Sequence, residues 1–132
     1  MADIQYDATA GRPLNSFEAY GIDAAARKNE DDLILDVHDL SVTLFTEDGA
    51  LPALSEVTFR MRRGETLAVV GESGCGKSMT ALSVMGLLPQ PPARIVGGSI
   101  DFEGTDLAKL SKDEMRAYRG NKIGMIFQEP MT

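Results

Sequence analysis

The stretch GESGCGKS, residues 71–78, decides the fold of this chain. It fills the pattern G-x-x-x-x-G-K-[ST], in which Gly71, Gly76, Lys77 and Ser78 are the defining residues of a phosphate-binding loop. On ordinary composition, a chance match in a chain of 132 residues is on the order of half a per cent. The alternative, a glycine-rich turn that carries an exposed lysine, is therefore the weaker interpretation.

The residue types in this loop suit a nucleoside triphosphate. Glycines permit backbone angles that other residues avoid, and they let successive amides surround an anion. The helix that begins near Lys77 adds its positive dipole end, and the lysine itself reaches the β- and γ-phosphates. The Ser78 hydroxyl is a candidate ligand for Mg²⁺. The predicted nucleotide-binding residues of the loop are Gly71, Glu72, Ser73, Gly74, Cys75, Gly76, Lys77, Ser78 and Met79.

The segments on both sides of the loop fit this interpretation. Residues 66–70, TLAVV, form a short apolar run, which is typical of a strand buried on both faces of a parallel sheet. Residues 77–88 have helical apolar spacing, and Pro89 ends the pattern. The sequence therefore predicts a strand, a loop and a helix in that order.

Two segments before the loop alternate between apolar and polar residues. Residues 33–45 and 54–61 both have period two, and turn-forming residues lie at 46–49. This pattern predicts an antiparallel hairpin.

Three further elements are predicted after the loop. Residues 97–102 and 123–127 have the composition of strands, and the second of these is apolar enough to be buried. Between them, residues 111–118 form a predicted helix in which Ser111 and Glu114 make a capping box.

Composition excludes several classes of protein. A hydrophobic fraction of 43% is normal for one globular domain. The net charge of -7 argues against a general nucleic-acid binder, so no nucleic-acid partner is expected. Cys75 is the single cysteine, which rules out an internal disulfide and fits a reducing compartment. No apolar run is long enough to span a membrane.

Residues 1–32 are mostly polar and aperiodic, so we expect a disordered leader.

With these features, the chain resembles the N-terminal part of an ATP-binding cassette (ABC) transporter ATPase. The resemblance rests on the loop within RRGETLAVVGESGCGKS, residues 62–78, and on the hairpin before it. It also rests on Phe45, where the family places an aromatic residue that stacks on adenine. The fourth feature is IFQEPMT, residues 126–132, which is similar to the family's glutamine loop and follows Lys77 at the expected distance.

Two longer runs are similar to one branch of that family. They are GESGCGKSMTALSVMGLLP, residues 71–89, and the IFQEPMT run. The branch powers uptake of dipeptides, oligopeptides, glutathione and related small solutes. The resemblance covers residues 33–132.

The resemblance implies a fold class and a set of roles. The fold would be α/β, the N-terminal portion of a P-loop NTPase of the ABC ATPase type. This portion holds an antiparallel β subdomain, the first strand, loop and helix of the core, and an incomplete sheet. ATP and Mg²⁺ would be the cofactors, Phe45 would stack on adenine, and Ser78 and Gln128 would be the metal ligands. Lys77 and Gln128 would be the catalytic residues, with Gln128 sensing the γ-phosphate.

The resemblance also implies partners and a location. They are a second ATPase subunit, transmembrane permease subunits and, indirectly, a solute-binding protein. The protein would lie at the cytoplasmic face of the membrane as a peripheral subunit.

Other family features do not occur in the sequence. In the family, four features would follow residue 132: the helical subdomain, the LSGGQ-like signature, the strand ending in Asp-Glu and the switch histidine. We therefore expect residues 33–132 to be a partial nucleotide-binding domain that at most binds nucleotide and does not hydrolyse ATP at a useful rate on its own. One alternative is a non-catalytic nucleotide-binding regulatory module. A small P-loop kinase or GTPase is disfavoured, because the chain has no arginine-rich lid and no NKxD guanine reader.

Overall fold

The computed structural model describes residues 6–7, 12–13, 32–72, 74 and 76–128. Near the N-terminus, β1 (Tyr6–Asp7) and β2 (Arg12–Pro13) pair as a two-stranded antiparallel sheet. The disordered leader predicted for residues 1–32 falls mostly outside the described residues, and it stays a prediction.

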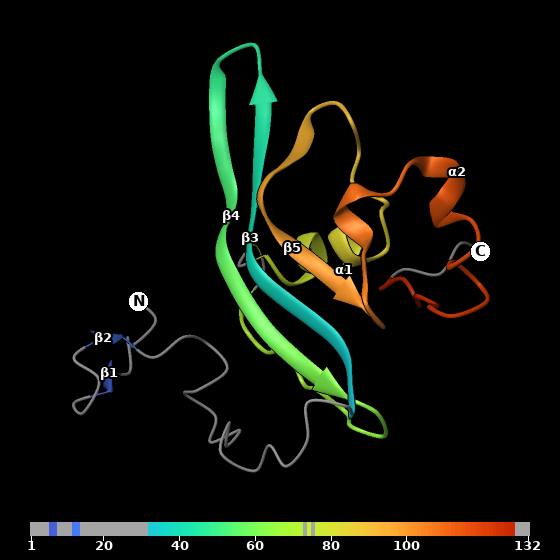
Figure 1. Cartoon of the computed structure of the whole chain (residues 1–132). Helices are drawn as coiled ribbons and strands as arrows, with labels where there is room; N and C mark the ends of the chain where they lie inside the picture. Colours follow the sequence, from blue (N-terminus) through green and yellow to red (C-terminus); the bar gives the residue numbers. More distant parts are fainter. Residues whose placement is uncertain (1–5, 8–11, 14–31, 73, 75, 129–132) are drawn as a thin grey trace.

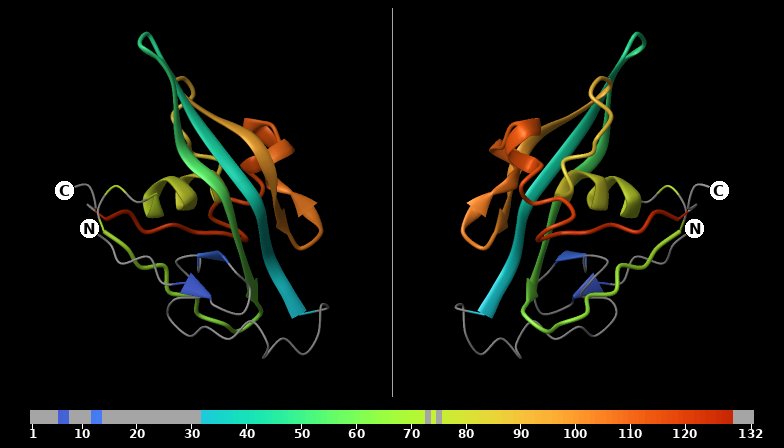
Figure 2. Two further views of the ribbon diagram at one scale, coloured as in Figure 1. Left: turned by 90° about the vertical axis from the view of Figure 1, so that its left-hand side faces the viewer. Right: turned by 90° about the vertical axis from the view of Figure 1, so that its right-hand side faces the viewer.

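A long hairpin dominates the described chain (Figure 1). It consists of β3 (Leu33–Thr46) and β4 (Gly49–Arg62), which confirms the predicted hairpin and extends both of its strands. The Thr46 hydroxyl donates a 3.0 Å hydrogen bond to the Gly49 carbonyl across the turn. In both views of Figure 2 this turn projects beyond every other element.

Two shorter strands complete the sheet in the order β4-β3-β5-β6. They are β5 (Ala93–Phe102) and β6 (Thr105–Asp106), and both pairings are antiparallel. The register of β3 against β5 shifts between His38 and Ser41, opposite Gly98. A Cβ at Gly98 would lie 2.4 Å from the carbonyl oxygens of His38 and Asp39, and its φ is +82°. Only glycine fits this irregularity without strain.

The helices pack against the sheet through one apolar core. They are α1 (Lys77–Val84), the 3-10 helix η4 (Leu107–Lys109) and α2 (Lys112–Met115). Most of the core comes from alternate strand residues, as the period-two pattern predicts. The buried core residues are Val37, Leu40, Val42, Leu54, Leu88, Ala93, Ile100, Phe102, Leu107 and Met115.

Two predicted strands do not form. Residues 66–70 have no strand pairing, and Val69 and Val70 are 39% and 44% exposed. Residues 123–127 make a single isolated bridge, from Ile123 to Arg119, and Ile126 is 96% exposed. An apolar run becomes a strand only when a neighbour satisfies its backbone groups, and no described strand pairs with either run. The predictions of buried strands at these positions were wrong for this structure.

The predicted helices begin correctly but end early. Helix α1 starts at Lys77 as expected and ends at Val84, before the prolines. Gly86 has a φ of +65°, its amide bonds to the Ser83 carbonyl, and the Leu87 amide bonds to the Leu82 carbonyl. This is a Schellman motif, so a glycine ends the helix. Helix α2 ends at Met115, and residues 116–118 form turns instead of the last part of the predicted helix.

Candidate nucleotide-binding site

The loop reaches the helix through two glycines in the left-handed region. Gly74 has a φ of +83°, and Gly76, the N-cap of α1, has a φ of +99°. No side chain caps the N-terminus of α1, and its first turn carries no acidic residue. The backbone amides of this first turn are therefore donors that can serve an anion.

Packing against β4 fixes the position of the helix start. A Cβ at Gly76 would lie 2.6 Å from Cδ2 of Leu54, so the loop backbone rests directly on that buried side chain. The Thr80 amide and hydroxyl donate to the Gly76 carbonyl at 2.9 and 2.8 Å. The loop thus packs directly on the hairpin where Gly76 meets Leu54.

Lys77 lies within its own loop. Its ammonium donates to the Glu72 carbonyl at 2.8 Å and also to the Gly71 carbonyl. Neutral carbonyls are weaker partners for a cation than phosphate oxygens are. A phosphate group entering the loop can therefore replace them.

A cavity of about 640 Å³ lies beside this loop. A volume of this size is in the range of small-molecule sites. Six of the predicted site residues line it: Gly74, Gly76, Lys77, Ser78, Met79 and Gln128. The structure thus brings Gln128 to the loop from far along the chain. Ser73 and Cys75 lie outside the described residues, and Gly71 and Glu72 take part through their bonds to Lys77.

Phe45 does not line this cavity. Its backbone amide donates to the Pro92 carbonyl at 2.8 Å, and its side chain is 46% exposed. The guanidinium carbon of Arg94 lies 5.3 Å from the ring centroid, a cation–π contact. The stacking of Phe45 on adenine stays a prediction.

Sequence reasoning missed the hairpin side of the cavity. Four residues near the hairpin turn line it, one from β3 and three from β4: Leu44, Leu51, Pro52 and Ala53. Leu44 pairs directly with Leu51 in the β3–β4 ladder. The alternation of the strands was a usable signal, because it separates the side of Leu44 from the side of Phe45.

The side-chain oxygens of Ser78 and Gln128 fit a magnesium ion whose remaining ligands include phosphate oxygens. Ser78 and Gln128 offer neutral oxygen donors at the same cavity, and Mg²⁺ prefers oxygen ligands. The described residues contain no cluster of three or more His, Cys, Asp or Glu side chains that could hold a metal. The negative charge of such a site would therefore come from the phosphates.

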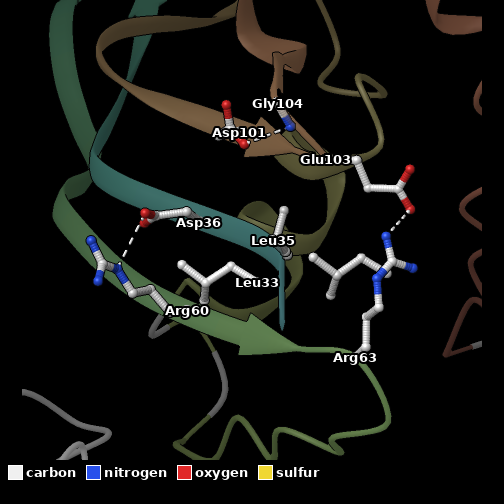
Figure 3. Close-up of a pocket in the computed structure, with 9 residues that line it drawn as sticks. Leu33, Leu35, Asp36, Arg60, Arg63, Asp101, Glu103 and Gly104 are labelled. Atoms are coloured by element: carbon white, nitrogen blue, oxygen red, sulfur yellow. Dashed lines mark hydrogen bonds and ion pairs between the residues drawn. The ribbon is translucent and has the colours of Figure 1, made fainter. Parts of the chain in front are cut away.

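A second cavity, of about 650 Å³, lies at the other end of the hairpin (Figure 3). Both of its arginines are paired with carboxylates, and a third carboxylate, Asp101, also lines it. Arg60 bonds to Asp36 at 3.2 Å, and Arg63 bonds to Glu103 at 3.2 Å. Three carboxylates against two paired arginines do not favour an anion in this cavity.

Comparison with known proteins identifies the family. The family model described as "ABC transporter" matches residues 54–132. The chain belongs to the ABC transporter family. This confirms the resemblance and the P-loop NTPase fold class.

Several curated members of this family are similar to the chain. A probable peptide ABC transporter ATP-binding protein of Sinorhizobium fredii is 52% identical over 101 residues, which are 76% of this chain and 30% of that protein. The oligopeptide transport ATP-binding protein OppD of Bacillus subtilis is 50% identical over 99 residues, 75% of this chain and 28% of that protein. The dipeptide transport ATP-binding protein DppD of Bacillus subtilis is also 50% identical, over 75% of this chain and 30% of that protein.

The chain therefore spans about 30% of the length of these curated relatives. No helix within the described residues has the length and apolar character needed to cross a membrane.

Proposed function

We propose that this chain binds ATP with Mg²⁺ at the loop of residues 71–78. The observation that supports this most is the single cavity that joins Gly74, Gly76, Lys77 and Ser78 to Gln128. A glycine-rich turn without function would not need a distant amide side chain at the same cavity.

Each residue has a proposed task. The left-handed Gly74 and Gly76 turn the backbone amides toward the phosphates, and the start of α1 adds its dipole. Lys77 exchanges its bonds to loop carbonyls for charge-assisted bonds to phosphate oxygens. Ser78 and Gln128 would hold Mg²⁺ through their neutral oxygens, and the ion would supply positive charge against the phosphates.

The wider proposal concerns the whole protein. Its relatives include ATP-binding proteins of peptide, oligopeptide and dipeptide transport. We propose that this protein energises an importer of peptides or similar small solutes. It would hydrolyse ATP as one of two ATPase subunits and act on permease subunits at the cytoplasmic face of the membrane. A solute-binding protein would deliver the substrate to those permease subunits.

Calorimetric titration with Mg·ATP tests the binding proposal. Lys77→Ala removes the ammonium, and Lys109→Ala is the matched control because its side chain is 84% exposed on η4. A lost bond to a charged group is worth about 1.5–3 kcal/mol, so Lys77→Ala should weaken binding by roughly tenfold or more. Lys109→Ala should bind like the parent chain. Equal affinities for all three proteins would contradict the proposal.

A further inference from the structure

Glu103 lies in the turn between β5 and β6 and lines the second cavity (Figure 3). Phe102 pairs with Thr105 across this turn, and the two residues between them have positive φ angles, +48° at Glu103 and +88° at Gly104. This is the geometry of a type I′ turn, whose first position favours asparagine, aspartate or glycine. A glutamate is strained at that position, which points to a task for its side chain.

The Glu103 carboxylate pairs with two cations from different parts of the chain. Its Oε1 lies 3.2 Å from Nη2 of Arg63, which follows the end of β4. Its Oε2 lies 3.6 Å from Nζ of Lys122, which directly precedes the run of residues 123–128. The Glu103 side chain is 30% exposed, less than that of either partner. A network of three charges stabilises a structure better than one exposed ion pair does.

Backbone and ring contacts hold this three-charge network in place. The Glu103 amide donates a 3.1 Å hydrogen bond to the Ile34 carbonyl on β3. The Lys122 ammonium lies 5.8 Å from the ring centroid of Tyr118. The Tyr118 ring in turn packs edge to face against Phe102 of the core, with 6.1 Å between the centroids. Lys122 is therefore held by both a carboxylate and an aromatic ring.

Lys122 stands at the start of the run that ends in Gln128. Within the described residues this run forms no strand and makes a single isolated bridge, at Ile123. The phosphate loop, by contrast, has a support of its own where Gly76 rests on Leu54. The position of Gln128 in the loop cavity therefore depends on the anchor of its run more than the position of the loop does.

We propose that Glu103 is a positioning residue for Gln128 and acts through Lys122. This inference rests on the proposed function, because it takes Gln128 to join a Mg²⁺ ion that is bound with the phosphates. By fixing the start of the run, the ion pair reduces the conformational freedom that Gln128 loses when nucleotide binds. Glu103 lines the second cavity and not the loop cavity, so it affects nucleotide binding only through Gln128.

The test separates nucleotide binding that needs Mg²⁺ from binding that does not. ATP is titrated in Mg²⁺ and in EDTA into the parent chain, Glu103→Gln, Lys122→Met and the double variant. Lys122→Met keeps an unbranched apolar stem beside Tyr118 and removes the charge, whereas Lys122→Arg keeps the charge. Asp113→Asn is the matched control, because it breaks an exposed ion pair within α2, 3.5 Å from Arg116. Circular dichroism verifies that each variant keeps its fold.

Glu103→Gln and Lys122→Met should each weaken Mg·ATP binding by about three- to fivefold and leave ATP binding in EDTA within about 1.5-fold. The double variant should bind like either single variant, because both substitutions remove the same link. Lys122→Arg and Asp113→Asn should bind like the parent. With magnesium inorganic triphosphate, the NMR shift of the Gln128 side-chain amide should shrink in Glu103→Gln, while the Gly76 amide shifts as in the parent.

Two kinds of result would overturn the proposal, and they can be told apart. If Glu103→Gln weakens ATP binding equally in Mg²⁺ and in EDTA, or leaves both unchanged, Glu103 does not position Gln128 and the proposed function survives. If the parent chain binds ATP in neither condition, the proposed function fails, and the positioning role fails with it.

Discussion

Replacing Gly76 by alanine tests how the phosphate loop is held on the hairpin. Gly76 has a φ of +99°, and a Cβ there would lie 2.6 Å from Cδ2 of Leu54. Gly74 is the matched control, because its φ is +83° and nothing lies within 4 Å of an added Cβ. The two substitutions thus share the backbone strain and differ in the steric contact.

The expected losses in the free energy of unfolding follow from the backbone strain and the steric contact. A left-handed backbone costs a residue with a Cβ about 1–2 kcal/mol, which applies to both variants. Displacing the buried side chain of Leu54 adds about 1–3 kcal/mol for Gly76→Ala alone. Gly76→Ala should therefore lower the free energy of unfolding by about 2–5 kcal/mol, and Gly74→Ala by about 1–2 kcal/mol or less.

Urea unfolding followed by circular dichroism measures both losses. The double variant with Leu54→Val adds a further test, because a smaller side chain relieves the contact. In that background the cost of Gly76→Ala should fall, which appears as coupling in a double-mutant cycle. Equal losses for Gly76→Ala and Gly74→Ala, or strict additivity with Leu54→Val, would refute the packing explanation.

Two other predictions concern the sheet and the capping box. Gly98→Ala should lower the free energy of unfolding by about 3 kcal/mol or more, since its Cβ meets backbone carbonyls at 2.4 Å. Gly97→Ala, whose Cβ would lie 3.8 Å from Ser41 Cβ, should cost far less, and similar losses in urea unfolding would contradict this. The Ser111 amide, followed by its hydroxyl, lowers the pKa of Glu114 below the ordinary 4.5. The hydrogen bonds to the Glu114 carboxylate therefore stabilise the fold fully above pH 4.5, the ordinary pKa. This stabilisation is lost as the pH falls through the lowered pKa of Glu114. Ser111→Ala should raise this pKa in an NMR titration, and an unchanged titration would argue against the capping box.

The sequence predicts local features of this fold well. The hairpin follows from alternation in residues 33–45 and 54–61, and the start of α1 follows from the loop motif. The capping box is also present: the Ser111 amide donates to Glu114 at 2.7 Å, and the Glu114 amide donates to the Ser111 hydroxyl at 3.2 Å. These features depend on residues close in sequence, so pattern and propensity suffice to find them.

Features that depend on distant neighbours were predicted poorly. The apolar runs at 66–70 and 123–127 have strand composition, yet they pair with no described strand. Composition alone cannot supply the partner that satisfies their backbone groups. Alternation can assign Leu44 and Leu51 to one face of the hairpin, but the cavity that they line exists only where the hairpin and the loop meet.

The most direct test of the proposed site is to map where a triphosphate binds. Magnesium inorganic triphosphate is added to isotopically labelled chain, and amide and side-chain NMR signals are followed. We predict that the largest shifts fall on Gly74, Gly76, Lys77, Ser78 and the side-chain amide of Gln128, the residues that line the loop cavity. Unchanged signals there, or shifts centred on the cavity of Arg60 and Arg63, would contradict the proposed site.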